Sequence, residues 1–166
     1  MMEVSLRIRG VDVDDEDVEQ IIGEHFSDAL WSSTDKIDLV TVFVDDENAV
    51  SQTVRWVEAL ETKIPDLKVA GVYRDHVGTT DIAQRSGVSR EAARKWTLDG
   101  TFPTPADYIS GANMKIWTWA EVAEWLKNER GFEFEPRPAS TAVLDQIEHH
   151  ILRSLTRRAS FLNDRK

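Results

Sequence analysis

The sequence predicts an α+β protein with two small domains and a C-terminal helix, and three observations lead to this prediction. Residues 1–75 alternate between apolar patterns of period two and apolar patterns of helical period. From residue 76 onward the pattern changes to short helical segments separated by glycine and proline. Residues 141–162 carry one apolar stripe at helical spacing.

The N-terminal domain, residues 1–75, is expected to contain four strands and two helices. Val4, Leu6 and Ile8 alternate with polar residues, which predicts a half-buried strand at residues 3–9. The remaining elements follow in order: a helix after the acidic run 12–17, strands at 29–36 and 38–46, a helix at 48–64 and a strand at 67–74. This β-α-β-β-α-β order looks like a ferredoxin-like sandwich, a fold that hosts many functions and identifies none of them.

Charge is distributed unevenly along the chain, whose net charge is −10. Residues 1–75 carry 7 Lys/Arg and 18 Asp/Glu, whereas residues 76–132 carry 7 of each kind. This imbalance argues against a general nucleic-acid coat protein and indicates two domains with different partners. The chain has no cysteine, which excludes disulfides and thiolate chemistry.

We expect a cytoplasmic protein that does not span a membrane. The first residues lack the long apolar core of a signal peptide. No stretch approaches the roughly 18 apolar residues of a membrane span.

Residues 79–99 have the features of a helix-turn-helix. Thr80 is expected to cap the first helix and Ser89 the second, because hydroxyl oxygens accept bonds from the free N–H groups of a helix start. Gly87 supplies the tight turn between them, where a side chain would conflict with positive φ. The inward residues of the pair are Ile82, Ala83, Val88, Ala92, Ala93 and Trp96.

The outward face of the second helix is then Arg90, Glu91, Arg94 and Lys95. Arg90 and Arg94 lie one helical turn apart and so are neighbours on the surface. Arginines near the start of such a helix can bind guanine or phosphate in the major groove. The alternative is an ordinary helical hairpin whose arginines are only solvated.

The stretch that follows carries further residues in a distinctive order. They are Gly100, Phe102, Pro103 and Pro105, then Trp117, and then Glu121, Val122, Trp125 and Leu126. Together with the helix pair, this order resembles the MerR superfamily, most closely its excisionase-like and AlpA-like members. The resemblance covers residues 79–128 and does not extend to the rest of the chain.

The resemblance implies a winged helix-turn-helix at residues 76–130, with helix 89–98 in the major groove and the wing on the backbone or minor groove. It implies roles in DNA binding for Thr80, Gln84, Arg85, Ser89, Arg90, Glu91, Arg94, Lys95, Asn113 and Lys115. Among these, Gln84 and Arg85 would lie near a phosphate, and Asn113 and Lys115 at the wing tip. This segment is less basic than many family members, so non-specific affinity should be weak, and specific contacts or dimerisation should provide the binding.

Residues 131–140 contain two prolines and read as a linker before a C-terminal helix at residues 141–166. Leu144, Ile147, Ile151 and Leu155 form the apolar stripe of that helix. Two interpretations remain open: the helix forms a dimer coil, or it folds back on its own chain.

We expect no catalytic residues, no cofactor and no metal site. The run 12–17 has Asp17 where a calcium loop needs glycine, so a capped helix start is favoured. Asp45, Asp46 and Glu47 have no histidine nearby in the sequence and are also interpreted as a helix cap. Enzymatic activity in the first domain would depend on Arg7 and Arg9 alone, and none is expected.

The sequence therefore predicts a sequence-specific double-stranded DNA-binding protein, either a transcriptional regulator or a recombination or excision accessory factor. We expect a homodimer, formed by the N-terminal domain or the C-terminal helix, that is nucleoid-associated when bound to DNA. The acidic domain could also bind a protein partner. The alternative function is a protein-interaction adaptor that keeps the winged-helix scaffold without reading DNA.

Overall fold

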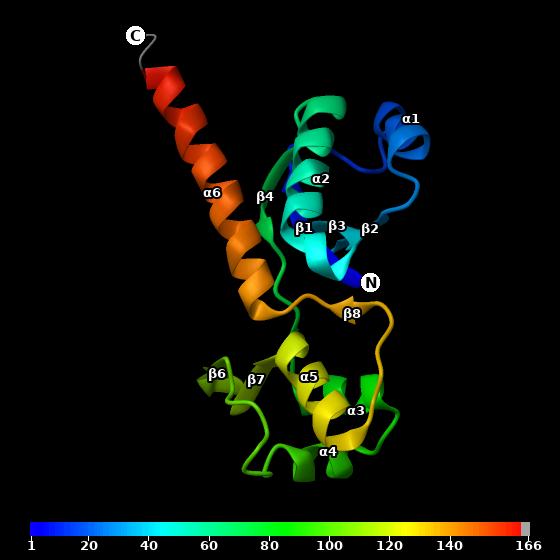
Figure 1. Cartoon of the computed structure of the whole chain (residues 1–166), viewed down its shortest axis with the longest axis vertical. Helices are drawn as coiled ribbons and strands as arrows, with labels where there is room; N and C mark the ends of the chain where they lie inside the picture. Colours follow the sequence, from blue (N-terminus) through cyan, green and yellow to red (C-terminus); the bar gives the residue numbers. More distant parts are fainter. Residues whose placement is uncertain (164–166) are drawn as a thin grey trace. The chain divides into compact units, whose positions relative to one another are not determined.

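The computed structural model describes residues 1–163, which form two compact units (Figure 1). The first unit comprises Met1–Tyr73 and the chain from Thr141 onward, and the second comprises Arg74–Ser140. Both units contain helices and antiparallel strands, which confirms the mixed α+β class. Residues 164–166, the end of the predicted C-terminal helix, lie outside the described residues.

The sheet of the first unit has the strand order β2-β3-β1-β4, and each neighbouring pair is antiparallel. Its strands are β1 (Met2–Arg9), β2 (Leu30–Thr34), β3 (Ile37–Val44) and β4 (Lys68–Val72). All four expected strands are thus present, including the weakly patterned second one.

One face of this sheet forms an aliphatic core. Leu6 pairs with Val40 and Val4 with Val42, and all four side chains are buried. Because side chains alternate along a strand, this register brings the apolar residues of β1 and β3 to the same face. The alternation predicted for β1 is confirmed.

The helix α1 (Glu16–His25) begins with the predicted carboxylate cap. The Asp15 side chain accepts hydrogen bonds from the backbone N–H of Asp17 at 3.0 Å and of Val18 at 3.4 Å. The acidic run is therefore a capped helix start, where carboxylates also interact favourably with the helix dipole.

Of the acidic cluster expected to form a helix cap, Asp45 occupies the cap position, but its side chain does not make the capping bond. A short 3-10 turn, η1 (Asp46–Asn48), precedes α2 (Ala49–Lys63), and Asp45 makes no side-chain bond to the turn. Its carboxylate instead accepts a hydrogen bond from the Gln52 side chain at 2.8 Å, and its backbone N–H donates to the same side chain at 2.9 Å. A glutamine one turn into α2 competes successfully for this carboxylate.

The C-terminal helix α6 (Thr141–Asn163) folds back on the first unit. It contacts α2 and β4, and Leu144, Ile147 and Ile151 are buried. The Glu148 carboxylate accepts a hydrogen bond from the backbone N–H of Val72 at 2.6 Å, which ties the helix to the end of β4. The interpretation that the helix folds back on its own chain is therefore confirmed for the N-terminal half of α6.

The second unit combines three helices with a three-stranded sheet of order β5-β7-β6. The helices are α3 (Thr79–Ser86), α4 (Arg90–Trp96) and α5 (Trp119–Arg130). The strands are β5 (His76–Val77), β6 (Asp107–Ile109) and β7 (Met114–Thr118), with a 3-10 turn, η2 (Ser110–Ala112), between the last two. A two-residue strand, β8 (Arg137–Pro138), lies in the stretch expected to be a linker.

The core of the second unit combines aliphatic side chains with several aromatic rings. Phe102, Trp117, Trp119 and Trp125 are all buried, and Trp96 packs against them. The inward position predicted for Trp96 is therefore confirmed.

Candidate nucleic-acid interface

A tight turn joins α3 to α4 and sets which residues face outward. Gly87 ends α3 with φ of 66°, a left-handed conformation that glycine adopts without strain. The backbone N–H of Val88 donates to the carbonyl of Ala83 at 3.0 Å, which closes the turn. Ser89 then caps α4 by accepting a hydrogen bond from the N–H of Ala92 at 3.1 Å. The predicted turn and the Ser89 cap are confirmed.

The predicted cap of α3 is wrong by two residues. Gly78 precedes the helix in an extended conformation, and its N–H donates to the Asp81 carboxylate at 2.8 Å. Thr80 lies inside the first turn and is exposed. The Asp81 carboxylate reaches back to the start of the helix, so a hydroxyl at Thr80 is not needed there.

The outer face of α4 is polar, while its inner face is buried through Ala93. The four outward side chains predicted by the sequence are all exposed: Arg90, Glu91, Arg94 and Lys95. Glu91 pairs with Lys95 across one turn, with 3.6 Å between the carboxylate oxygen and the ammonium nitrogen.

Within the described residues, neither Arg90 nor Arg94 makes an ion pair or a side-chain hydrogen bond. The two guanidinium groups are therefore the uncompensated charges of α4. Because they lie one turn apart on the same face, they can engage the same ligand.

Arg85, expected near a phosphate, is already bound within the unit. Its guanidinium donates two hydrogen bonds to the Asp75 carboxylate, one of them at 3.1 Å. The same group lies over the ring of Trp119, 4.9 Å from the ring centre. This bidentate pair and the cation–π contact give Arg85 a structural role. Its neighbour Gln84 is exposed on α3.

The segment 100–105, which contains Phe102 and Pro103, is anchored in the core of the second unit just before the β6–β7 hairpin. Phe102 contacts the rings of Trp117 and Trp125 edge to face, with centroids 5.7 Å and 4.8 Å away. Trp117 donates its indole N–H to the carbonyl of Pro103 at 3.0 Å, and Trp125 donates to the Thr101 hydroxyl at 2.9 Å. Both buried indole N–H groups are thus satisfied, as buried polar groups must be.

Asp99 holds the turn that leads into this segment. Its carboxylate accepts hydrogen bonds from the Thr101 hydroxyl at 2.7 Å and from the Thr101 N–H at 2.9 Å. These bonds, helped by the nearby charge of Arg130, lower the pKa of Asp99 below its ordinary value. The segment after α4 is therefore fixed by local bonds as well as by packing.

The strands β6 and β7 form the hairpin that corresponds to the predicted wing. Asn113 sits at its tip with φ of 48°, and its side-chain oxygen accepts a hydrogen bond from the Tyr108 hydroxyl at 2.5 Å. Lys115 pairs with Tyr108 across the hairpin, and both Asn113 and Lys115 are exposed.

Sequence reasoning missed the exposed apolar side chains of this hairpin, namely Tyr108, Ile109 and Met114. Each is between 41% and 51% exposed. Tyr108 and Ile109 are consecutive and so point to opposite faces of β6, and nothing in the sequence shows that both faces are exposed here.

No protein-family model, no curated protein and no solved structure matches this chain. Within residues 1–163, no helix is both long and apolar enough to cross a membrane. The same part of the chain contains no group of three or more His, Asp or Glu side chains that could hold a metal ion.

Proposed function

We propose that the second unit is a winged helix-turn-helix that binds double-stranded DNA and reads its sequence in the major groove with α4. The observation that carries this proposal is the pair of exposed, unpaired guanidinium groups of Arg90 and Arg94 on a helix whose other side is buried. Arginine binds guanine edges and phosphates through two parallel hydrogen bonds, so such a pair suits the groove.

Three further features support the proposal. The α3–α4 turn holds α4 with its polar face outward, the hairpin β6–β7 lies after it in the chain, and the hairpin exposes Asn113 and Lys115. The order of these parts is also the order on which the resemblance to excisionase-like MerR proteins rests. A wing of this kind would contact the backbone and set the register of α4 on the duplex.

In this proposal the protein acts by binding alone, without catalysis or a cofactor, and it binds DNA of the nucleoid in the cytoplasm. One seven-residue helix covers few base pairs, so we propose that two copies bind adjacent half-sites as a dimer. We also propose a ferredoxin-like fold for the first unit, which the antiparallel order β2-β3-β1-β4 supports.

A selection from a randomised duplex library at physiological salt tests the proposal. The wild-type protein should enrich one motif, repeated if two copies bind, and the Arg90→Ala/Arg94→Ala variant should not enrich it. Arg55→Ala/Arg153→Ala, which removes two exposed arginines from the first unit, serves as the matched control and should enrich the same motif. Equal enrichment by both variants would show that α4 does not read the groove.

The exposed apolar side chains of the hairpin favour a second candidate function, a protein-interaction adaptor. Ile109 and Met114, which pair across the two strands, would then form part of a protein-binding surface, because neighbouring exposed apolar side chains are typical of such surfaces. The two functions respond differently to salt. DNA binding should weaken steeply between about 50 and 200 mM salt, whereas an apolar protein complex should persist.

A further inference from the structure

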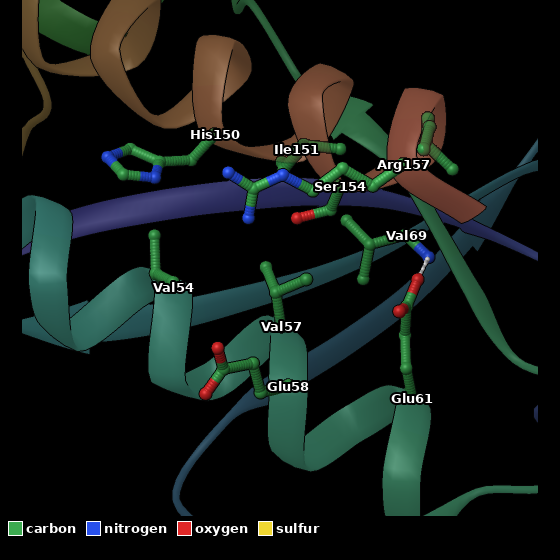
Figure 2. A pocket seen from close by; sticks show the side chains of 10 residues that line it. Val54, Val57, Glu58, Glu61, Val69, His150, Ile151, Ser154 and Arg157 are labelled. Carbon is green, nitrogen blue, oxygen red and sulfur yellow. Dashed lines mark hydrogen bonds between the residues drawn. The ribbon is translucent and has the colours of Figure 1, made fainter. Parts of the chain in front are cut away.

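A cavity of about 210 Å³ lies along the seam between α2 and α6 in the first unit (Figure 2). Its floor is made of branched apolar side chains from three elements: Val54 and Val57 of α2, Val69 of β4, and Ile151 and Leu155 of α6. A ligand that fills it is small and has an apolar body.

The two walls of the cavity carry charges of opposite sign. Arg157 of α6 extends along the cavity toward His150, and the Glu58 carboxylate lies on the α2 side (Figure 2). Among the residues whose side chains the structure describes, neither Glu58 nor Arg157 has an ion-pair partner. Each charge is therefore available to a ligand.

The remaining polar groups of the cavity differ in availability. The carboxylate of Glu61 accepts a hydrogen bond from the backbone N–H of Val69 at 3.1 Å, so it serves the fold. The Ser154 hydroxyl points into the cavity on the same side as the Arg157 guanidinium (Figure 2). Arg157 and Ser154 thus provide a cation and a hydrogen-bond donor beside each other, which together suit a carboxylate.

We propose that this cavity binds a free α-amino acid with a branched apolar side chain, such as leucine. The carboxylate of the ligand bonds to Arg157 and Ser154 of α6, the ammonium group bonds to Glu58 of α2, and the side chain covers the valine floor. A zwitterion is the ligand class that satisfies both walls, because a simple fatty acid leaves Glu58 unpaired and a simple amine leaves Arg157 unpaired.

The proposal gives the first unit a ligand-sensing role that does not depend on DNA binding by the second. Ligand bound across the seam would join α2 to the part of α6 that lies beyond Ile151. Leu152 in that part is 52% exposed, in contrast to the buried Ile147 one turn and a half earlier. The ligand would therefore hold the less packed portion of α6 against the unit.

Titration of the full-length protein with L-leucine, followed through backbone amide NMR shifts, tests the site. We expect saturable shifts at Val54, Val57 and Ile151. Three analogues serve as controls: 4-methylpentanoate lacks the ammonium group, 3-methylbutylamine lacks the carboxylate and glycine lacks the apolar body. Each should bind at least about tenfold more weakly than L-leucine, because each loses either a charged hydrogen bond or the apolar contact.

Two variants assign the ligand charges to the walls. Glu58→Gln should weaken L-leucine about tenfold or more and leave 4-methylpentanoate unchanged, whereas Arg157→Gln should weaken both and leave 3-methylbutylamine unchanged. The matched controls are Arg153→Gln, an exposed arginine one turn earlier on α6, and Glu19→Gln on α1. Both controls should bind L-leucine as the wild type does.

Several results would overturn the proposal. They are an absence of saturable shifts up to about 20 mM L-leucine, shifts that map away from α2 and α6, and equal affinity for 4-methylpentanoate and L-leucine. Unchanged L-leucine affinity in the folded Glu58→Gln variant would also overturn it. None of these results bears on the DNA selection, which uses different variants and a different ligand.

Discussion

The two units differ in net charge and in where charged side chains without an ion-pair partner lie. The first, residues 1–73 and 141–166, carries 11 Lys/Arg and 20 Asp/Glu, whereas the second, residues 74–140, carries 9 and 10. The proposed DNA-binding surface nevertheless lies on the nearly neutral second unit. Asp75 pairs with Arg85 and Glu91 with Lys95, whereas Arg90 and Arg94 of α4 have no partner among the described residues. What distinguishes α4 is that two unpaired arginines lie one turn apart on the same face, which net charge alone does not reveal.

The cores of the two units also differ. Aliphatic side chains dominate the first, whereas the second adds rings from α4, α5, β7 and the segment after α4 to its aliphatic residues. An aromatic ring buries more area than an aliphatic side chain, so the loss of one ring removes more of a small core. Single substitutions should therefore have larger effects in the second unit.

Phe102→Ala should have the largest effect on stability. The ring is 9% exposed and contacts Trp117 and Trp125, so its removal should lower the free energy of unfolding of the second unit by about 3–5 kcal/mol. Chemical denaturation followed by tryptophan fluorescence measures this, because four of the six tryptophans lie in the second unit. The amide spectrum of the first unit should stay unchanged.

Tyr108→Ala is the matched control, since it removes an aromatic ring from the same unit that is 51% exposed. Its effect should stay within about 0.5–1 kcal/mol, which is usual for a surface position. Equal losses for Phe102→Ala and Tyr108→Ala would contradict the idea that a few buried rings hold this unit together.

Arg94→Ala should separate binding from stability. We expect the affinity for the selected DNA site to fall by about 1–3 kcal/mol, or roughly 5- to 150-fold, with no change in the unfolding midpoint. Fluorescence anisotropy with a labelled duplex measures the affinity. Arg94→Lys should recover only part of it, because an ammonium group cannot make the two parallel bonds of a guanidinium.

Arg85→Ala gives the opposite pattern and sharpens the comparison. Its partners are Asp75 and Trp119, so its loss should destabilise the unit by about 1 kcal/mol, a modest value because the pair is more than a third exposed. If Arg85→Ala weakened DNA binding as much as Arg94→Ala did while the unit stayed folded, the distinction between paired and unpaired arginines would be wrong.

Glu148→Ala tests how α6 is held on the first unit. The variant leaves the Val72 N–H without its acceptor, so stability should fall by about 1–2 kcal/mol. Glu148→Gln keeps an acceptor oxygen and should lose less than half as much. Hydrogen exchange of the Val72 amide measures the effect locally. Unchanged protection in Glu148→Ala would show that apolar packing alone positions the helix.

The sequence predicted elements whose signals are local. Alternation predicts β1, the acidic run predicts the start of α1, and Gly87 with Ser89 predicts the turn and cap before α4, because each signal spans only a few neighbouring residues. The outward residues of α4 follow from helical periodicity once the inward residues are known.

Side-chain pairs between distant residues could not be predicted in this way. The family resemblance placed Arg85 near a phosphate, and nothing local in the sequence shows that Asp75, ten residues earlier, binds it. The cavity between α2 and α6 was missed for the same reason. It exists only because the C-terminal helix folds back on the first unit, which no local signal shows. Such pairings depend on the tertiary arrangement of elements, which periodicity does not determine.

The smallest predicted effect concerns Asp99, whose bonds to Thr101 are local and exposed. Its pKa is lowered in the folded state. The charged carboxylate therefore stabilises the fold at pH values above the ordinary Asp pKa of about 3.9. That contribution should disappear as the pH falls from about 4 through the lower folded pKa. NMR titration of the Asp99 carboxyl should show its pKa rise toward the ordinary range in Thr101→Val, which removes the hydroxyl bonded to Asp99. The same hydroxyl accepts the Trp125 indole N–H, so the pKa and not the stability of this variant is the readout. An unchanged pKa in Thr101→Val would mean that the backbone N–H and Arg130 suffice to lower it.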